Sequence, residues 1–365
     1  MTVSDTDPLL LKRPHPPIQP GKAPLSPLFD SCKDLHRLIP ITAPWTKAHL
    51  SPTPDDPKRR LPQAIAHRGF KALYPENTMA AFTAAVAAGT HAIETDLHLS
   101  SDGVVVISHD PSLKRCYGVD KLPHEPIPRF VHLLNFLARP EYAHVWLLLD
   151  LKLTNTADEL FAAMSRDLEA VSPPKDMPWD KRVVMGCWNQ PFLNASLSVL
   201  PTYSTAHISF SPLDSSRFLR DPAYAGLSFA LLQPTLVGPW ASRFLRAVRA
   251  APDAHSRQFF VWTVNEVEWM DWAIRTGVDG VITDDPATFL QVRSRYEVDG
   301  RANATRRQQV TDDSPESFLA VVPPPTSWGR WARLYLRVVT VQLLFTVLAP
   351  FFLRSKRFKF TKMGN

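Results

Sequence analysis

The order of apolar and polar positions divides the chain into a proline-rich start, a long patterned centre and a hydrophobic end. Residues 1 to about 60 hold roughly a dozen prolines. Because each proline fixes its own φ and disfavours helix at the preceding residue, we expect no regular element in this N-terminal extension. The alternative is that its Leu and Trp residues lie as a strap on the domain that follows.

From Leu61 onward, short apolar runs that end in polar residues alternate with longer helical stretches, a pattern typical of repeated βα units. A helix is expected over 78–88, with Asn77 as its N-cap, and another over 267–276, closed by Gly277. Nine strands are predicted, one of them a short accessory segment: 64–67, 92–97, 104–108, 145–151, 183–188, 204–208, 229–232, 259–263 and 280–283. About eight βα units over residues 61–297 predict an α/β fold, a (β/α)8 TIM barrel.

The C-terminal part changes character twice. Residues 298–329 are polar and contain prolines, which indicates a spacer. Within residues 330–365, the stretch 334–353 is interrupted only by Arg337 and Gln342 among strongly polar positions. At about 1.5 Å per residue, 20 residues just cross a hydrocarbon core of about 30 Å. Because basic residues flank the stretch on both sides, a hairpin or in-plane insertion is an equal alternative, and a buried amphipathic helix is a third.

Composition narrows the class of partner. The chain has 365 residues, 45% of them hydrophobic, and a formal charge of +6. Eight basic residues and no acidic ones lie from Arg330 onward, so the rest of the chain carries about −2. The basic tail therefore points to an anionic membrane surface and not to a nucleic acid. Three scattered cysteines indicate neither a disulfide framework nor a zinc site.

Polar residues collect where the predicted strands end, which is the active-site face of such a barrel. Residues two apart in a strand project to one face, so Glu94 and Asp96 both point inward. The same spacing places Asp150 and Lys152 together. Three converging carboxylates would repel one another, so a divalent cation is expected between Glu94, Asp96 and Asp150. All-oxygen ligation favours Mg²⁺ or Ca²⁺.

The remaining residues of this set match what cleavage of a phosphodiester requires. Arg68 and Lys152 supply positive charge for the phosphate. His67 and His109 supply proton transfer, because imidazole titrates near neutral pH. Glu76 is expected to hold Arg68 or the loop backbone.

At these positions the sequence resembles the glycerophosphodiester phosphodiesterase family. The motifs that carry the resemblance are His67-Arg68-Gly69, Pro75-Glu76-Asn77-Thr78, Glu94-Thr95-Asp96, Asp102-Gly103 and His109-Asp110, with the later segments 261–265 and 277–286. The resemblance implies that His67 and His109 are the catalytic acid and base, and that Glu94, Asp96 and Asp150 bind the metal. It also implies that Arg68 and Lys152 contact phosphate and that Trp262 forms a wall against glycerol. Many members carry Glu where this chain has Asp150.

Within that family, the Asp-Leu-Lys motif, the Thr-Asp-Asp-Pro ending and the hydrophobic tail look most like the fungal phosphatidylglycerol-specific phospholipase C. This resemblance implies cleavage of phosphatidylglycerol to diacylglycerol and glycerol phosphate at a membrane. Hydrolysis of soluble diesters such as glycerophosphocholine, or of lysophospholipids, is the alternative, and a non-catalytic lipid-binding barrel is a remote one. The expected location is the cytoplasmic face of a membrane, with endoplasmic reticulum and lipid droplets as leading sites.

Overall fold

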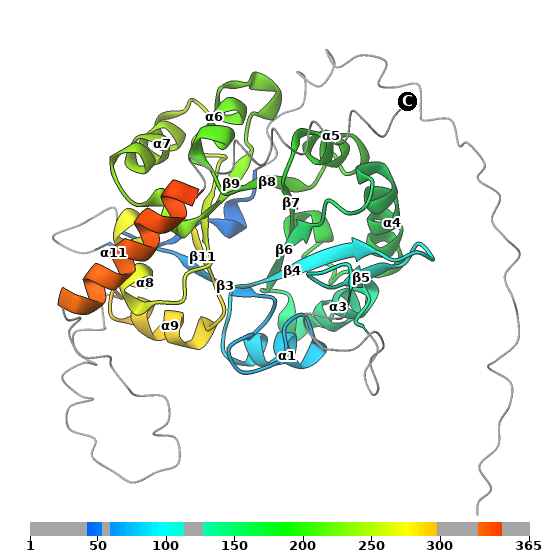
Figure 1. Cartoon of the computed structure of the whole chain (residues 1–365). Helices are drawn as coiled ribbons and strands as arrows, with labels where there is room; N and C mark the ends of the chain where they lie inside the picture. Colours follow the sequence, from blue (N-terminus) through cyan, green and yellow to red (C-terminus); the bar gives the residue numbers. More distant parts are fainter. Residues whose placement is uncertain (1–41, 53–58, 113–126, 298–327, 345–365) are drawn as a thin grey trace, which may run out of the picture. The chain divides into compact units, whose positions relative to one another are not determined.

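The computed structural model describes residues 42–52, 59–112, 127–297 and 328–344. Its centre is a closed barrel in which β3 pairs with both β11 and β4, so that the sheet joins end to end (Figure 1). The eight barrel strands are all parallel to their neighbours. They are β3 (Gln63–His67), β4 (Ala92–Leu99), β6 (Trp146–Leu151), β7 (Val183–Cys187), β8 (Ser204–Ser209), β9 (Ser228–Leu232), β10 (Phe259–Trp262) and β11 (Gly280–Thr283).

The predicted TIM barrel is confirmed, including its accessory strand. That strand is β5 (Val105–Ile107), which pairs antiparallel with the end of β4 and takes no place in the barrel wall. Helices lie outside the strands (Figure 1). They are α1 (Met79–Ala87), α3 (Phe130–Leu137), α4 (Ala157–Ala170), α5 (Gln190–Val199), α6 (Pro212–Arg220), α7 (Pro239–Ala250), α8 (Val267–Thr276) and α9 (Pro286–Ser294).

Two helix ends were predicted, one correctly. Gly277 closes α8 with a φ of 71°, the left-handed conformation that glycine adopts without steric cost. The prediction for α1 was wrong by one residue, since Thr78 is its N-cap and accepts a hydrogen bond from the Ala81 amide at 3.1 Å. Asn77 has a φ of 59° and turns its side chain toward the carboxylates described below.

Strand alternation separates two apolar layers. On β6, Trp146 and Leu148 face the barrel interior together with Ile65 and Phe260, while Leu147, Leu149 and Leu151 face the helices. The indole of Trp146 donates to Gln63 Oε1 at 2.7 Å, which satisfies its only polar atom inside the barrel. The interior is therefore a packed floor, and polar residues occupy the inward positions only toward the strand C-termini.

Part of the proline-rich segment lies on the barrel, which corrects the expectation of no regular element before residue 60. Residues 44–46 form a 3-10 turn, and β1 (His49–Leu50) pairs with β2 (Arg60–Leu61). Trp45 packs edge-on against Trp146 at 5.5 Å, and its carbonyl accepts from Gln63 Nε2 at 2.8 Å. These contacts are the ones expected from the strap alternative. They are favourable because the apolar surface of the indole is removed from water. Residues 1–41 lie outside the described part of the chain.

The described part of the expected membrane tail is a single amphipathic helix, α11 (Trp328–Leu343). Its Leu334 and Val338 are buried, and Trp331 packs against Trp269 of α8 at 5.8 Å. Among the described residues, no helix combines the length and the apolar character needed to span a bilayer. The expected polar spacer up to residue 327 and the end of the tail from residue 345 lie outside the described residues.

Candidate active site

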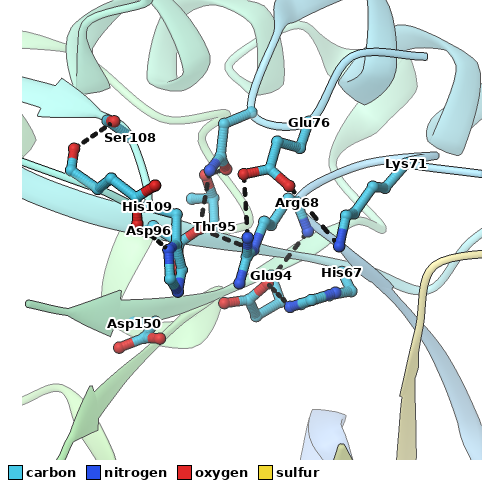
Figure 2. Close-up of polar contacts among 12 residues, drawn as sticks. His67, Arg68, Lys71, Glu76, Glu94, Thr95, Asp96, Ser108, His109 and Asp150 are labelled. Carbon is cyan, nitrogen blue, oxygen red and sulfur yellow. Dashed lines mark hydrogen bonds and ion pairs between the residues drawn. The ribbon is translucent and has the colours of Figure 1, made fainter. Parts of the chain in front are cut away.

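The strand register brings the predicted site residues together. His67 at the end of β3 is paired with Glu94 of β4, and Asp96 of β4 is paired with Asp150 of β6. All four continue the inward-facing rows of their strands above the apolar floor. The side chains therefore converge at the carboxyl ends of three adjacent strands (Figure 2).

Glu94, Asp96 and Asp150 form a buried carboxylate cluster, with one oxygen from each within 4.8 Å of the others. Burial, together with the charges of Asp96 and Asp150, raises the pKa of Glu94 well above its ordinary value. Burial likewise raises the pKa of Asp150. A divalent cation between the three oxygens would relieve this repulsion, and hard oxygen donors suit Mg²⁺ or Ca²⁺. The residues present therefore fit a metal ion.

Two cations border the cluster. Lys152 Nζ lies 2.7 Å from Asp96 Oδ1 and 2.5 Å from Asp150 Oδ2. Burial acts to lower the pKa of Lys152, but these two carboxylates outweigh it and raise the pKa above its ordinary value. Burial would similarly raise the pKa of Asp96, yet Lys152 and Arg68 hold it below the usual range. The ion pairs therefore favour the ionised form of Asp96, whereas burial favours the protonated forms of Glu94 and Asp150.

Arg68 is fixed by both its backbone and its side chain. Its amide donates to the Glu94 carbonyl at 2.8 Å and to Glu94 Oε2 at 3.1 Å. Its guanidinium lies 3.0 Å from Asp96 Oδ2 and 3.0 Å from Glu76 Oε1. Glu76 was expected to hold Arg68 or the loop backbone, and it forms an ion pair with Arg68. The next residue, Gly69, has a φ of 84°, and a Cβ there would lie 2.7 Å from Ala81, so only glycine lets this loop approach α1.

His67 is oriented by a residue far away in the sequence. Its Nδ1 lies 2.5 Å from Asp284 Oδ1, just beyond the end of β11, while its Nε2 lies 4.0 Å from Glu94 Oε2. Because an ionised carboxylate only accepts hydrogen bonds, Nδ1 carries the proton and Nε2 presents its lone pair to the site. Asn265 Nδ2 donates to the other oxygen of Asp284 at 2.8 Å and fixes the carboxylate in turn. Burial lowers the pKa of His67.

His109 has a comparable carboxylate partner. Its Nδ1 lies 2.7 Å from Oδ1 of the adjacent Asp110. His98 holds the loop that carries His109, because its Nε2 hydrogen-bonds to the His109 carbonyl at 3.1 Å. In Figure 2, His67 and His109 lie on either side of Glu94. Two imidazoles, each hydrogen-bonded through Nδ1 to a carboxylate, thus border the carboxylate cluster. This arrangement suits one of them to donate a proton and the other to accept one.

An aromatic wall adjoins the cluster. Trp262 lies 5.6 Å from Trp188 and 5.3 Å from Phe210, and the last two rings lie 5.0 Å apart. The wall is joined to the polar site because Trp188 Nε1 donates to Asp150 Oδ1 at 2.6 Å. Asp150, one methylene shorter than Glu, is thus held by an indole and an ammonium group.

The comparisons with known proteins agree with this geometry. The sequence model described as the Glycerophosphoryl diester phosphodiesterase family matches residues 67–288, which is more than half of the chain. The chain belongs to the glycerophosphoryl diester phosphodiesterase family. Enzymes of this family are metal-dependent phosphoric diester hydrolases, and the chain is therefore a phosphodiesterase.

Individual relatives match between 62% and 64% of this phosphodiesterase. It is 24% identical over 251 residues to a glycerophosphodiester phosphodiesterase of Caldanaerobacter subterraneus, covering 62% of this chain and 96% of that protein. It is 27% identical over 279 residues to a lysophospholipase D of Rattus norvegicus, covering 64% and 87%. A phosphodiesterase of Oleispira antarctica, solved with the product sn-glycerol-3-phosphate, superposes with a TM-score of 0.53 at 22% identity, covering 64% and 96%. At this low identity, the likeness to the solved structure shows a shared fold only.

Sequence reasoning missed Asp284, Trp188, Phe210 and Asn77. Asp284 and Trp188 directly follow β11 and β7, so the rule that residues at strand C-termini face the active site applied to them as well. Asn77 was read as a helix cap, but its Nδ2 donates to Asp96 Oδ2 at 2.7 Å. Its own Oδ1 accepts from Thr95 Oγ1 at 2.9 Å, so it positions a carboxylate of the cluster.

Proposed function

We propose that this phosphodiesterase hydrolyses phosphatidylglycerol to diacylglycerol and glycerol phosphate, a phospholipase C reaction, at a membrane. The observation that carries the chemistry is the carboxylate cluster with a carboxylate-bound imidazole on either side. The choice of a lipid as leaving group is supported by the aromatic wall, which adjoins the cluster through the hydrogen bond from Trp188 to Asp150.

The mechanism uses the vicinal hydroxyl of the head-group glycerol as its nucleophile. One of His67 and His109 accepts the proton of that hydroxyl, and its oxygen bonds to phosphorus as the bond to the diacylglycerol oxygen breaks. The other histidine gives a proton to the departing oxygen. Water then opens the cyclic glycerol phosphate with the two roles reversed, which restores both histidines. Attack by the hydroxyl of the substrate is favoured because none of the site residues described above is a serine, threonine or cysteine positioned to attack phosphorus.

Charge in the site is balanced by the cationic groups. A divalent ion held by Glu94, Asp96 and Asp150 would neutralise the negative charge that develops on the phosphoryl oxygens. Arg68 and Lys152 add two positive charges beside it, already fixed by ion pairs. Such preorganised charges need no rearrangement during the reaction.

A second candidate function is hydrolysis of lysophospholipids or of soluble glycerophosphodiesters. It is supported by the similarity to a protein named lysophospholipase D, at 27% identity over 87% of that protein. The polar chemistry is the same in both candidates, since each substrate presents a glycerol hydroxyl beside the phosphodiester. The candidates differ only in the group that leaves.

The deciding experiment is a product assay on the purified chain with Mg²⁺ or Ca²⁺. Phosphatidylglycerol, lysophosphatidylcholine and glycerophosphocholine are offered in parallel, in mixed micelles where needed. The His67→Ala variant tests the site, and His255→Ala, an exposed histidine on a loop between α7 and β10, serves as its matched control. Diacylglycerol from phosphatidylglycerol, lost only in His67→Ala, supports the proposal. Turnover confined to the other two substrates overturns it in favour of the second candidate.

The membrane setting is part of the same proposal. The basic and apolar residues beyond position 344 would hold the chain at the cytoplasmic face of a membrane, with endoplasmic reticulum and lipid droplets as the expected sites. A chain ending at Gly329 should then move from the membrane fraction to the soluble fraction. If the truncated chain still sediments with membranes, this tail is not the anchor.

A further inference from the structure

The exposed large hydrophobic side chains are unevenly distributed over the described residues. All but one of them lie on loops that follow barrel strands, in the first turn of α6, or on α11 and its end, the exception being Leu50. Leu73 follows β3, Leu153 follows β6 and Leu213 follows β8, with exposed fractions of 70%, 51% and 82%. These loops stand at the carboxyl ends of the strands, around the opening that leads to the carboxylate cluster.

α11 carries three different surfaces along its length. At about 100° per residue, Leu334, Val338 and Trp331 share the side that packs on the barrel. A second strip, rotated away from the barrel, consists of apolar residues that remain exposed. These are Leu336, Val339 and Leu343, each between 48% and 66% exposed. Tyr335 borders the strip, since it is 49% exposed and its ring also packs against Trp269 of α8 at 5.7 Å. Arg333 and Arg337 form a third strip beside it, and no acidic residue occurs between 328 and 344.

The contacts of α11 place it at the same end of the barrel as the active site. Arg330 pairs with Glu266 and Glu268, which begin α8 just after β10. At the other end of the helix, Gln342 Nε2 donates to the carbonyls of Pro234 and Val237, which follow β9, at 2.8 Å each. The helix thus runs beside the β9 and β10 loops, at the same end of the barrel as the exposed leucines (Figure 1).

We propose that this rim, made of Leu73, Leu153, Leu213 and the exposed strip of α11, is a docking surface for an anionic lipid bilayer. Its leucines follow β3, β6 and β8, and α11 lies beside the loops after β9 and β10. These strands are distributed around the barrel and do not all lie on one side of it. A planar lipid surface laid across this end of the barrel would contact all of them, whereas a bound peptide would contact one side.

The charge pattern favours lipid over a protein partner. Arg333 and Arg337 lie beside the apolar strip, as in helices that bury their apolar side in the acyl region and place cations among anionic head groups. Arg337 Nη1 also lies 3.5 Å from Glu266 Oε1, but its side chain remains 75% exposed. The 21 residues after Leu344 begin with further apolar residues and contain five more basic residues and no acidic one, so the charge continues beyond the helix. Docking in this orientation would present the opening of the barrel to lipid head groups, a consequence that rests on the proposed function.

The first test measures which side of the chain enters the lipid. An environment-sensitive fluorophore is attached at Leu213→Cys, Leu336→Cys or Leu50→Cys, in a full-length chain whose Cys32 and Cys116 are replaced by Ser. Vesicles contain phosphatidylcholine with or without phosphatidylserine. Neither head group carries a vicinal hydroxyl, so the result does not depend on the proposed reaction. We expect a blue shift at positions 213 and 336 with the anionic vesicles, and none at position 50.

The second test measures affinity for the same vesicles. The double variant Leu336→Glu/Val339→Glu should bind at least about tenfold more weakly, since losing the burial of one leucine-sized side chain is worth about that factor. Leu50→Glu, the matched control at 74% exposure, should bind like the unmodified chain. Both variants should keep the thermal midpoint and any turnover of a water-soluble diester.

Three results would overturn the docking surface. The first is equal binding by all variants, which would assign attachment to the residues after 344. The second is a fluorophore at position 50 that shifts as much as those at 213 and 336. The third is light scattering that shows a dimer for the unmodified chain and a monomer for the double variant, because the strip would then join two copies of the chain.

Discussion

Replacing Asp284 by Asn isolates the contribution of the carboxylate behind His67. The side chains have the same size, but the amide carries no charge and can donate to Nδ1. Donation would move the imidazole proton to Nε2, the atom that faces the site. The variant therefore removes the charge that stabilises an imidazolium and disfavours the tautomer that accepts a proton.

The size of the effect follows from the geometry. Nδ1 and Oδ1 lie 2.5 Å apart, so the centres of the two charges are roughly 4 Å apart, and two unit charges at that distance interact by about 4 kcal/mol at an effective dielectric constant of 20. The two side chains are 12% and 23% exposed, which justifies the higher dielectric value. At 1.36 kcal/mol per tenfold, the whole interaction corresponds to about 10³-fold, and the remaining amide dipole reduces it. We expect kcat to fall about 10²- to 10³-fold.

The assay compares kcat and KM for Asp284→Asn and for Asp158→Asn, an exposed carboxylate in the first turn of α4 with the same change in net charge. KM and the thermal midpoint should stay near those of the unmodified chain. A glycerol phosphodiester of 4-nitrophenol, whose leaving group needs no proton, then assigns the role of His67. A smaller loss on this substrate identifies an acid, and an equal loss identifies a base. A kcat within about threefold of the unmodified chain, or a loss matched by a lower thermal midpoint, would refute the positioning role.

Three further predictions concern the metal and the stability of the barrel. Trp188→Phe keeps the aromatic wall but removes the hydrogen bond to Asp150, so titration calorimetry should show Mg²⁺ affinity about 10- to 100-fold lower; unchanged affinity would contradict the role. Chelation should abolish turnover, and Mg²⁺ restored at 100 times its Kd should raise the unfolding free energy by about 2.7 kcal/mol, whereas identical melting curves would exclude binding to the folded state. The neutral Nδ1 of His91 accepts from the Ala64 amide, and burial lowers the pKa of His91 to about 3. Because the folded-state pKa is the lower one, this stability is present above about pH 6.5 and is lost as pH falls toward 3. Between pH 7 and 5 the unmodified chain should lose about 2 kcal/mol more than His91→Asn in denaturant unfolding, and equal losses would exclude His91 as the cause.

Most of the fold could be predicted from the sequence, because alternation within a strand is a local property. The inward positions of β4 run from Ala92 through Glu94 and Asp96, and those of β6 run from Trp146 to Asp150. Polar residues at the carboxyl ends of such strands meet around one opening whatever the details of packing. The accessory strand 105–107 was also predictable, although only pairing showed that it is the one outside the barrel wall.

Contacts that join distant segments required the tertiary structure. Asp284 is 217 positions from His67, and no local pattern pairs them; closure of the barrel through β3 and β11 does. The register between β6 and β7 likewise brings Trp188 within reach of Asp150.

The C-terminal segment is a second region whose packing could not be predicted from the sequence. Its hydrophobicity alone is compatible with a membrane anchor or a packed helix, because composition does not say which strip of a helix meets a neighbour. The sequence by itself determined the barrel, the carboxylates and the two histidines. The tertiary structure decided what orients those histidines, and which strip of α11 is buried against Trp269 and which remains exposed beside the active site.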